Sequence, residues 1–176
     1  MVILSAQDSD AHINKIAPDL FKAYPNIKSM AKADVESLLQ YIGKVRSSKK
    51  KATWIIDIAQ TVKQDKNIPI TIEGLTSLKG IGRKSANVIM REAKAVPQGI
   101  MVDLHVVRVA PRLGIATAGT GDNIEKQLMQ ALPQDMWSEI GMAMSFLGRE
   151  TCRPKNPKHD ECIVSSDCQY CLLHKV

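Results

Sequence analysis

Aromatic residues are scarce in this 176-residue sequence, at 4 % of the chain, so a nucleic-acid binder that stacks bases on aromatic platforms is not expected. No apolar run approaches the roughly 20 residues that a membrane span needs. The apolar segment at the start has no basic residues before it and is too short for a secretory signal. Strand patterns are scarce as well. These absences predict a helical protein, for which neither a membrane span nor an export signal is expected.

Positive charge and apolar residues are what the sequence does contain. The 24 Lys and Arg residues exceed the 18 Asp and Glu residues, for a net charge of +6. This balance favours a polyanionic partner, although many basic proteins have none. Apolar residues make up 44 % of the chain, enough to bury a core. No acid lies between Ser37 and Ile56, and the basic residues there form either a phosphate contact or a solvated face: Lys44, Arg46, Lys49, Lys50 and Lys51.

Apolar residues recur at helical spacing through most of the chain, which predicts an all-α fold. Pro97–Gly99 separates two helical groups, so we expect domains at residues 1–97 and 98–176. Pro111 is expected to end or kink its helix near Ala110. The expected helices carry Ile13, Ile16, Leu20 and Phe21 after a cap at Asp8 or Ser9; Val35 to Ile42 between Asp34 and Gly43; Trp54 to Val62 after Ser47 or Ser48; Arg83 to about Lys94; Val106 to Ala110; Ile124 to Leu132; and Met136 to Leu147.

The first six residues, Met1 to Ala6, are apolar and resemble the last turns of a buried helix whose beginning is missing. Without that beginning, a helical core would expose apolar surface. We therefore expect this sequence to be truncated at its N-terminus.

Two closely spaced glycines, Gly80 and Gly82, lie between helical stretches. Glycine adopts backbone conformations closed to other residues, and Ile81 between them would plug the two helices together. Amide groups around Gly82, at the start of the second helix, would then form an anion site suited to a DNA phosphate. The alternative is an ordinary corner between two helices.

All four cysteines lie near the end of the chain, with the spacing C-x9-C-x5-C-x2-C. No other cysteine and no secretory signal accompany them, so a disulfide scaffold is not expected. Zinc and an iron–sulfur cluster both take four thiolates, and both remain candidates. The candidate ligands are Cys152, Cys162, Cys168 and Cys171.

These motifs together resemble the endonuclease III family of DNA glycosylases. The resemblance rests on the hairpin sequence at residues 78–89, Leu-Lys-Gly-Ile-Gly-Arg-Lys-Ser-Ala-Asn-Val-Ile, and on the cysteine-rich tail. It continues in Leu4-Ser5-Ala6-Gln7-Asp8, Tyr41-Ile42-Gly43 and Val102-Asp103-Leu104-His105, in the family's order. It implies a helix-hairpin-helix glycosylase fold with two helical subdomains and a C-terminal iron–sulfur loop.

The resemblance also implies a set of site residues. Lys84 would be the nucleophile and Asp103 its acidic partner, and His105 is given no catalytic role. Gln7 would fill the gap left by a flipped-out base, and Val45 falls near the loop that wedges into the base stack. The hairpin would hold the DNA backbone through Gly80, Ile81, Gly82, Arg83 and Ser85.

The implied activity is base-excision repair by a bifunctional enzyme. A lysine amine can capture the sugar as a Schiff base, and β-elimination then cleaves the abasic site. The implied partner is double-stranded DNA with an oxidised pyrimidine or an abasic site. We expect a monomer that acts in the cytoplasm, at the nucleoid, if the source is bacterial.

The implied cofactor is a [4Fe–4S] cluster, but the tail departs from the family's spacing. The second ligand position falls on His159, and Cys171 is additional. We expect four cysteine ligands, because thiolate is the usual ligand for these clusters; ligation by His159 is the alternative. Two other functions stay open, a truncated DNA-binding protein without catalysis and a zinc-bound structural module.

Overall fold

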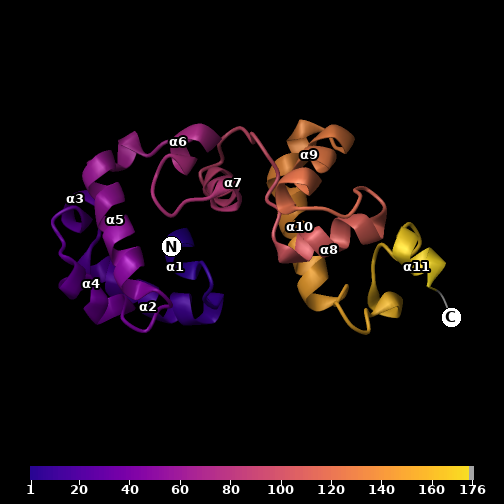
Figure 1. The fold of residues 1–176 in the computed structure, drawn as a ribbon, viewed down its shortest axis with the longest axis horizontal. Helices are drawn as coiled ribbons and strands as arrows, with labels where there is room; N and C mark the ends of the chain where they lie inside the picture. The colour runs from indigo at the N-terminus through magenta and orange to yellow at the C-terminus, as the bar shows by residue number, and fades with distance from the viewer. Residues whose placement is uncertain (175–176) are drawn as a thin grey trace. The chain divides into compact units, whose positions relative to one another are not determined.

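The computed structural model describes residues 1–174, the side chain of Asp10 excepted, and its regular elements in that part are all helical (Figure 1). The expectation of an all-α fold is therefore confirmed. None of the helices in the described part is both long and apolar enough to cross a membrane. The chain divides into two compact units, Met1–Ile89 and Met90–Val176.

The first unit is built around α5, against which α1, α3 and α4 pack. Its core consists of Leu4, Ile13, Leu20, Leu38, Ile42, Val45, Ala52 and Ile56. Its elements are α1 (Val2–Ser5), α2 (Asp10–Ala23), α3 (Ile27–Met30), α4 (Val35–Ile42), α5 (Ser48–Val62), the 3₁₀ turn η1 (Asp65–Asn67), α6 (Ile72–Thr76) and most of α7 (Arg83–Glu92).

Side-chain caps fix where the first helices begin. The Ser9 side chain accepts a hydrogen bond from the backbone N–H of His12, and Asp34 accepts one from Ser37. Such caps satisfy N–H groups that have no partner within the helix. The starts expected for α2 and α4 are thus confirmed. Phe21 is an exception to the expected apolar face, because it is 50 % exposed.

The second unit packs α10 against α8, and α8 against α9. Its core consists of Ile100, Val106, Val109, Ala110, Ile124, Leu128 and Met144. Its elements are α8 (Leu104–Leu113), α9 (Gly121–Ala131), η2 (Gln134–Met136), α10 (Trp137–Glu150), η3 (His159–Glu161) and α11 (Gln169–Leu173).

Helix α8 corrects one part of the expectation for Pro111: the helix passes through Pro111 and ends at Leu113, so it does not end near Ala110. A proline removes one backbone donor, whose helical partner is the carbonyl four residues earlier. At Pro111 one hydrogen bond, to the carbonyl of Val107, is therefore missing while the helix continues. The helix then stops at Gly114, whose φ of 86° is left-handed and whose N–H donates to the carbonyls of Ala110 and Pro111.

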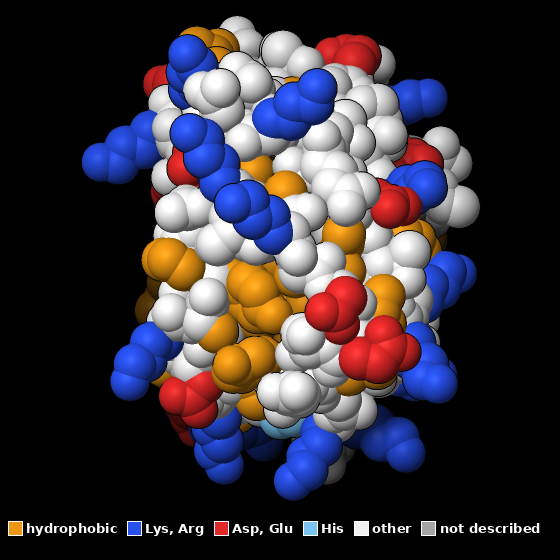
Figure 2. All heavy atoms as spheres, turned by 90° about the vertical axis from the view of Figure 1, so that its left-hand side faces the viewer, with side chains coloured by type: hydrophobic (Ala, Val, Ile, Leu, Met, Phe, Trp, Pro, Cys, Tyr) orange, Lys and Arg blue, Asp and Glu red, His pale blue; other side chains and the backbone are white. Residues whose placement is uncertain are grey.

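Figure 2 looks onto the side of the molecule that lies at the left of Figure 1, where α3 and α4 are labelled. Apolar side chains gather in the middle of this face. Charged side chains of both signs surround them, and Lys and Arg dominate the rim. On this face the Lys and Arg side chains are thus distributed around the rim and are not confined to one stripe.

Candidate functional site

The glycine hairpin follows α6 and is held against α5 by Trp54. Gly80 has a left-handed φ of 80°. A Cβ atom added there would lie 2.4 Å from Trp54 Cε3, so only glycine fits. Ile81 is buried, with 8 % of its surface exposed, as expected of a plug between two helices. Lys79 Nζ, 2.8 Å from Asp57 Oδ2, adds an ion pair to α5.

Helix α7 begins directly after the hairpin. Gly82 is exposed, with no atom within 4 Å of an added Cβ, and the carbonyl of Gly82 accepts the first helical bond from Ala86. The next two side chains, Arg83 and Lys84, are exposed, and Ser85 is half-buried. The first N–H groups of a helix lack partners within it and carry a partial positive charge. This end of α7 therefore presents a lysine amine beside backbone groups that favour an anion.

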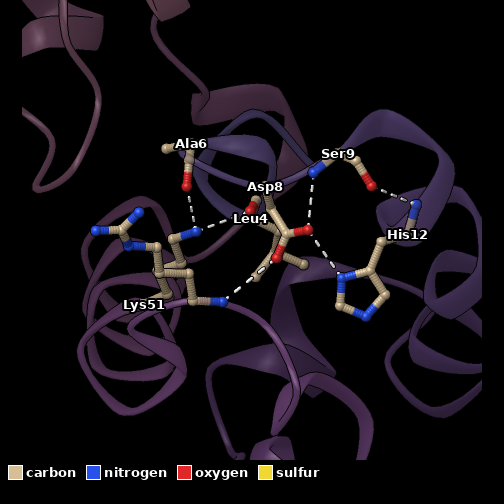
Figure 3. A network of polar contacts seen from close by, with 7 residues as sticks. Leu4, Ala6, Asp8, Ser9, His12 and Lys51 are labelled. Carbon is tan, nitrogen blue, oxygen red and sulfur yellow. Dashed lines mark hydrogen bonds and ion pairs between the residues drawn. The ribbon is translucent and has the colours of Figure 1, made fainter.

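Gln7 lies in a tight turn after α1 and is exposed. Its φ of 60° is left-handed, an unfavourable conformation for a residue other than glycine. Lys51, on α5, donates from Nζ to the carbonyl oxygens of Leu4 at 2.8 Å and Ala6 at 2.6 Å (Figure 3). The carbonyls just before Gln7 are thus held by a side chain from the core of the unit.

The carboxylate of Asp8 holds the other side of the Gln7 turn (Figure 3). Asp8 Oδ1 accepts from the Ser9 N–H at 2.8 Å and lies 2.8 Å from His12 Nδ1. Asp8 Oδ2 accepts from the N–H of Arg46 at 3.3 Å. The hydrogen bonds from His12, Ser9 and Arg46 together lower the pKa of Asp8, although burial acts in the opposite direction. The turn that carries Gln7 is therefore tied to the loop that carries Arg46.

The loop between α4 and α5 does not present Val45 to solvent. Val45 is 3 % exposed and belongs to the core of the first unit, which leaves it no free apolar surface to insert into a base stack. Lys44 and Arg46, on either side, are exposed. Lys51 corrects the expected basic stretch, because it is 4 % exposed and burial lowers its pKa. Its amine donates to carbonyl oxygens before the Gln7 turn and is not available to contact phosphates.

Asp103 lies in the second unit, as the N-cap of α8, and is 7 % exposed. Its Oδ1 accepts from the N–H groups of His105 at 2.8 Å and Val106 at 3.0 Å. Its Oδ2 accepts from Ser145 Oγ at 2.7 Å and lies 3.9 Å from Arg149 Nη2.

These contacts decide the charge of Asp103. Burial raises the pKa of Asp103, but the hydrogen bonds from Ser145, Val106 and His105 outweigh burial and lower it overall. The second unit therefore offers an ionised, fixed carboxylate. Lys84 belongs to the first unit and Asp103 to the second.

The cysteine tail is gathered around Arg112, near the end of α8. Arg112 Nη1 lies 3.3 Å from Cys152 Sγ, and the Arg112 carbonyl lies 3.4 Å from Cys168 Sγ. The guanidinium also donates to the carbonyls of Arg153 and Pro154 and lies 4.5 Å above the ring of Tyr170. One side chain thus joins the segment after α10 to α11.

All four cysteines are free thiols; Cys168 and Cys171 are buried, and Cys152 and Cys162 are half-buried. Within residues 1–174, no three His, Cys, Asp or Glu side chains are placed together as metal ligands. The donor set nevertheless suits an iron–sulfur cluster in its chemistry, because four thiols lie in one segment and a guanidinium from α8 donates to one of the sulfur atoms. The ring of His159 stacks on that of Tyr170, with the ring centroids 5.9 Å apart. Tyr170 directly precedes Cys171 in the sequence.

Sequence reasoning did not find three of these residues. Of the three, only Ser145 carries a signal in the sequence, because it is a small polar residue among apolar residues of an expected helix. Lys51 looks like any lysine of a basic stretch, and Arg112 looks like an ordinary helix-terminal cation. Their partners are 42, 47 and 40 positions away along the chain, so only the fold identifies them.

The glycine hairpin between α6 and α7, in a chain whose described elements are all helical, defines a helical protein of the helix-hairpin-helix class. The chain belongs to the HhH-GPD superfamily of base excision DNA repair proteins, which matches residues 1–134. It is an endonuclease III-like enzyme of that superfamily, so the resemblance seen in the sequence is confirmed.

Relatives support this assignment over nearly the whole chain. Endonuclease III of Thermotoga maritima is 32 % identical over 170 residues, which are 96 % of this chain and 79 % of that protein. Endonuclease III of Bacillus subtilis is 34 % identical over 171 residues, 96 % of this chain and 78 % of that protein. A solved structure of a trapped endonuclease III–DNA covalent intermediate, an estranged-adenine complex, matches with a TM-score of 0.85 at 33 % identity, covering 98 % of this chain and 82 % of that one.

Proposed function

We propose that this protein removes oxidised pyrimidines from double-stranded DNA and cleaves the resulting abasic sites, with Lys84 as the nucleophile. The observation that carries the proposal is the exposed Lys84 amine in the first turn of α7, beside the glycine hairpin. A relative that matches 98 % of this chain has been trapped in a covalent intermediate with DNA, and such an intermediate requires a nucleophile. Because the relatives named above come from bacteria, we place this activity in the bacterial cytoplasm, at the nucleoid.

The proposed reaction begins with the neutral amine of Lys84. The Nζ lone pair forms a bond to C1′ of the damaged nucleotide, and the bond between C1′ and the base breaks, so that the base leaves with the electron pair and takes up a proton. Opening of the sugar ring gives a Schiff base. Loss of a C2′ proton then expels the 3′ phosphate by β-elimination, which cuts the strand. Water finally hydrolyses the Schiff base and frees Lys84.

In this scheme Asp103 accepts the proton that Lys84 loses and stabilises the positive charge that develops on the sugar. Three hydrogen bonds keep its carboxylate ionised, which both tasks require. A neutral carboxylic acid would do neither.

Contacts with the DNA backbone are proposed for the hairpin and the start of α7, where exposed Gly82 and Arg83 adjoin Ser85. Phosphate contacts of this kind position a duplex without reading its sequence. Gln7, exposed on its tied turn, would occupy the space that a flipped base leaves. For the loop after α4, we propose Lys44 and Arg46 as the groups that contact DNA.

We further propose that Cys152, Cys162, Cys168 and Cys171 hold a [4Fe–4S] cluster. When bound, the cluster would close the tail as a structural link. The protein's own contribution is Arg112, whose guanidinium lies 3.3 Å from Cys152 Sγ and would offset the thiolate charge. Iron content and broad visible absorbance that Cys171→Ser abolishes and His159→Ala preserves would support this ligand set. A colourless protein containing zinc would refute it.

Borohydride trapping on a duplex with one abasic site tests the lysine. The wild-type protein should form a covalent complex, and Lys84→Gln should form none. Lys79→Gln is the matched control, since Lys79 is also exposed on the hairpin segment, and it should trap as the wild type does. Folded wild-type protein that binds the duplex but never traps would instead identify a non-catalytic DNA-binding protein.

A further inference from the structure

The hydroxyl of Ser145 is buried against the carboxylate that the proposed reaction uses. Ser145 is 1 % exposed and its Oγ lies 2.7 Å from Asp103 Oδ2, a short distance typical of a hydrogen bond to a charged oxygen. A buried hydroxyl needs a partner, and here the partner is the carboxylate to which the reaction assigns a proton. The contact lies wholly inside the second unit.

The fold brings Ser145 to Asp103 through a row of small residues on α10. Gly141, Ser145 and Gly148 are spaced as one helix face. A Cβ on Gly141 would lie 2.3 Å from the carbonyl oxygen of Met101, and one on Gly148 would lie 2.8 Å from His105 Cβ. Helix α10 therefore lies close to the backbone of Met101 on one side of Ser145 and to side chains of α8 on the other, which places a short side chain within reach of Asp103.

The lone pairs of Asp103 show what the contact achieves. A carboxylate has about four acceptor positions. Oδ1 uses two for the N–H groups of His105 and Val106, and Oδ2 uses one for Ser145. Arg149 Nη2, at 3.9 Å from Oδ2, is beyond hydrogen-bond distance. One lone pair of Oδ2 remains, and the direction of the Ser145 bond decides where it points.

We propose that Ser145 is a positioning residue that keeps the Asp103 carboxylate ionised and fixes the direction of the remaining lone pair of Oδ2. The inference rests on the proposed function of Asp103. Within the second unit, the titratable and charged groups that face Asp103 are His105 on α8 and Arg149 on α10. Neither replaces the Ser145 hydroxyl, because His105 binds Asp103 through its backbone N–H and Arg149 lies too far away.

The first test is the pH dependence of single-turnover cleavage at an abasic site. Ser145→Ala should move the acidic limb to higher pH by about one unit, since a hydrogen bond to a charged group is strong enough for such a change. Ser145→Cys, which keeps the size but donates weakly, should move it by less. A rate that falls by the same factor at every pH, with the limb unmoved, would mean that Ser145 is merely structural.

The second test does not depend on activity. The pKa of Asp103 is lowered in the folded protein, so Asp103 contributes stability at pH values above its unfolded pKa, and this stability is lost as pH falls through the folded pKa. The difference in melting temperature between the wild type and Ser145→Ala should therefore be largest at neutral pH and shrink in acid. In an Asp103→Asn background this pH-dependent part should disappear.

The two tests separate the possible failures. An inactive wild type that still shows the acid-dependent melting difference would refute the proposed function while preserving the action of Ser145 on Asp103. A melting difference that is constant with pH would refute the inference even in an active enzyme. If Ser145→Ala does not fold, Ser145→Cys decides both measurements.

Discussion

Replacing Gly80 by alanine is the sharpest test of the hairpin. The added Cβ would lie 2.4 Å from Trp54 Cε3 and 2.9 Å from Cδ2 and Cζ3. Forcing a methyl group into a filled site costs roughly 1–3 kcal/mol, and a left-handed φ costs a residue other than glycine roughly 1 kcal/mol more. We expect the free energy of unfolding to fall by about 3 kcal/mol. At about 3 °C for each kcal/mol, the melting temperature should fall by about 10 °C.

Gly82→Ala is the matched control, only two residues away. No atom lies within 4 Å of its added Cβ, and a surface change of this kind usually alters stability by less than about 0.5 kcal/mol. If DNA occupies that open space, Gly82→Ala should weaken binding to an abasic-site duplex in fluorescence anisotropy while melting normally. Equal melting of the two variants would refute the close packing between Trp54 and Gly80.

Two further predictions concern stability and are measured by urea unfolding. Lys51→Met should lower the free energy of unfolding by about 2 kcal/mol, because two hydrogen bonds from a charged donor are lost and the cost of burying the ammonium group is only partly recovered. Exposed Lys49→Met, on the same helix, should change it by less than about 0.5 kcal/mol; similar losses in both variants would contradict the anchoring of the Gln7 turn. Thr120→Ala should cost about 1 kcal/mol, because the Thr120 side chain caps α9 by accepting from the Asn123 N–H. An unchanged midpoint would show that this cap contributes nothing.

Local chemistry made much of the fold predictable from the sequence. Asp34 begins α4 because its carboxylate accepts from an N–H group of the first turn, and the helix ends before Gly43, as the sequence predicts. The end of α8 was not predictable in this way. Proline is unfavourable inside a helix, yet α8 continues through Pro111 to Leu113 and ends at the left-handed Gly114.

In the candidate site, too, the features set by neighbouring residues were predictable and those set by tertiary contacts were not. The hairpin, Lys84 and the capping role of Asp103 are encoded in short stretches of sequence, where neighbouring residues determine the geometry. The burial of Val45 and Lys51 and the reach of Ser145 to Asp103 depend on helices that meet only in three dimensions. No periodicity distinguishes a buried lysine with two carbonyl partners from a solvated one.

The Lys51 and Asp8 contacts give the Gln7 turn a thermodynamic advantage. A loop that is mobile in the free protein loses conformational entropy when it meets its ligand, and that loss weakens binding. Here folding has already restrained the backbone on both sides of Gln7, through a lysine on one side and a carboxylate on the other. Association with a DNA duplex should consequently require little additional ordering of this segment. More of the free energy of its contacts is then available to stabilise the DNA with a base flipped out.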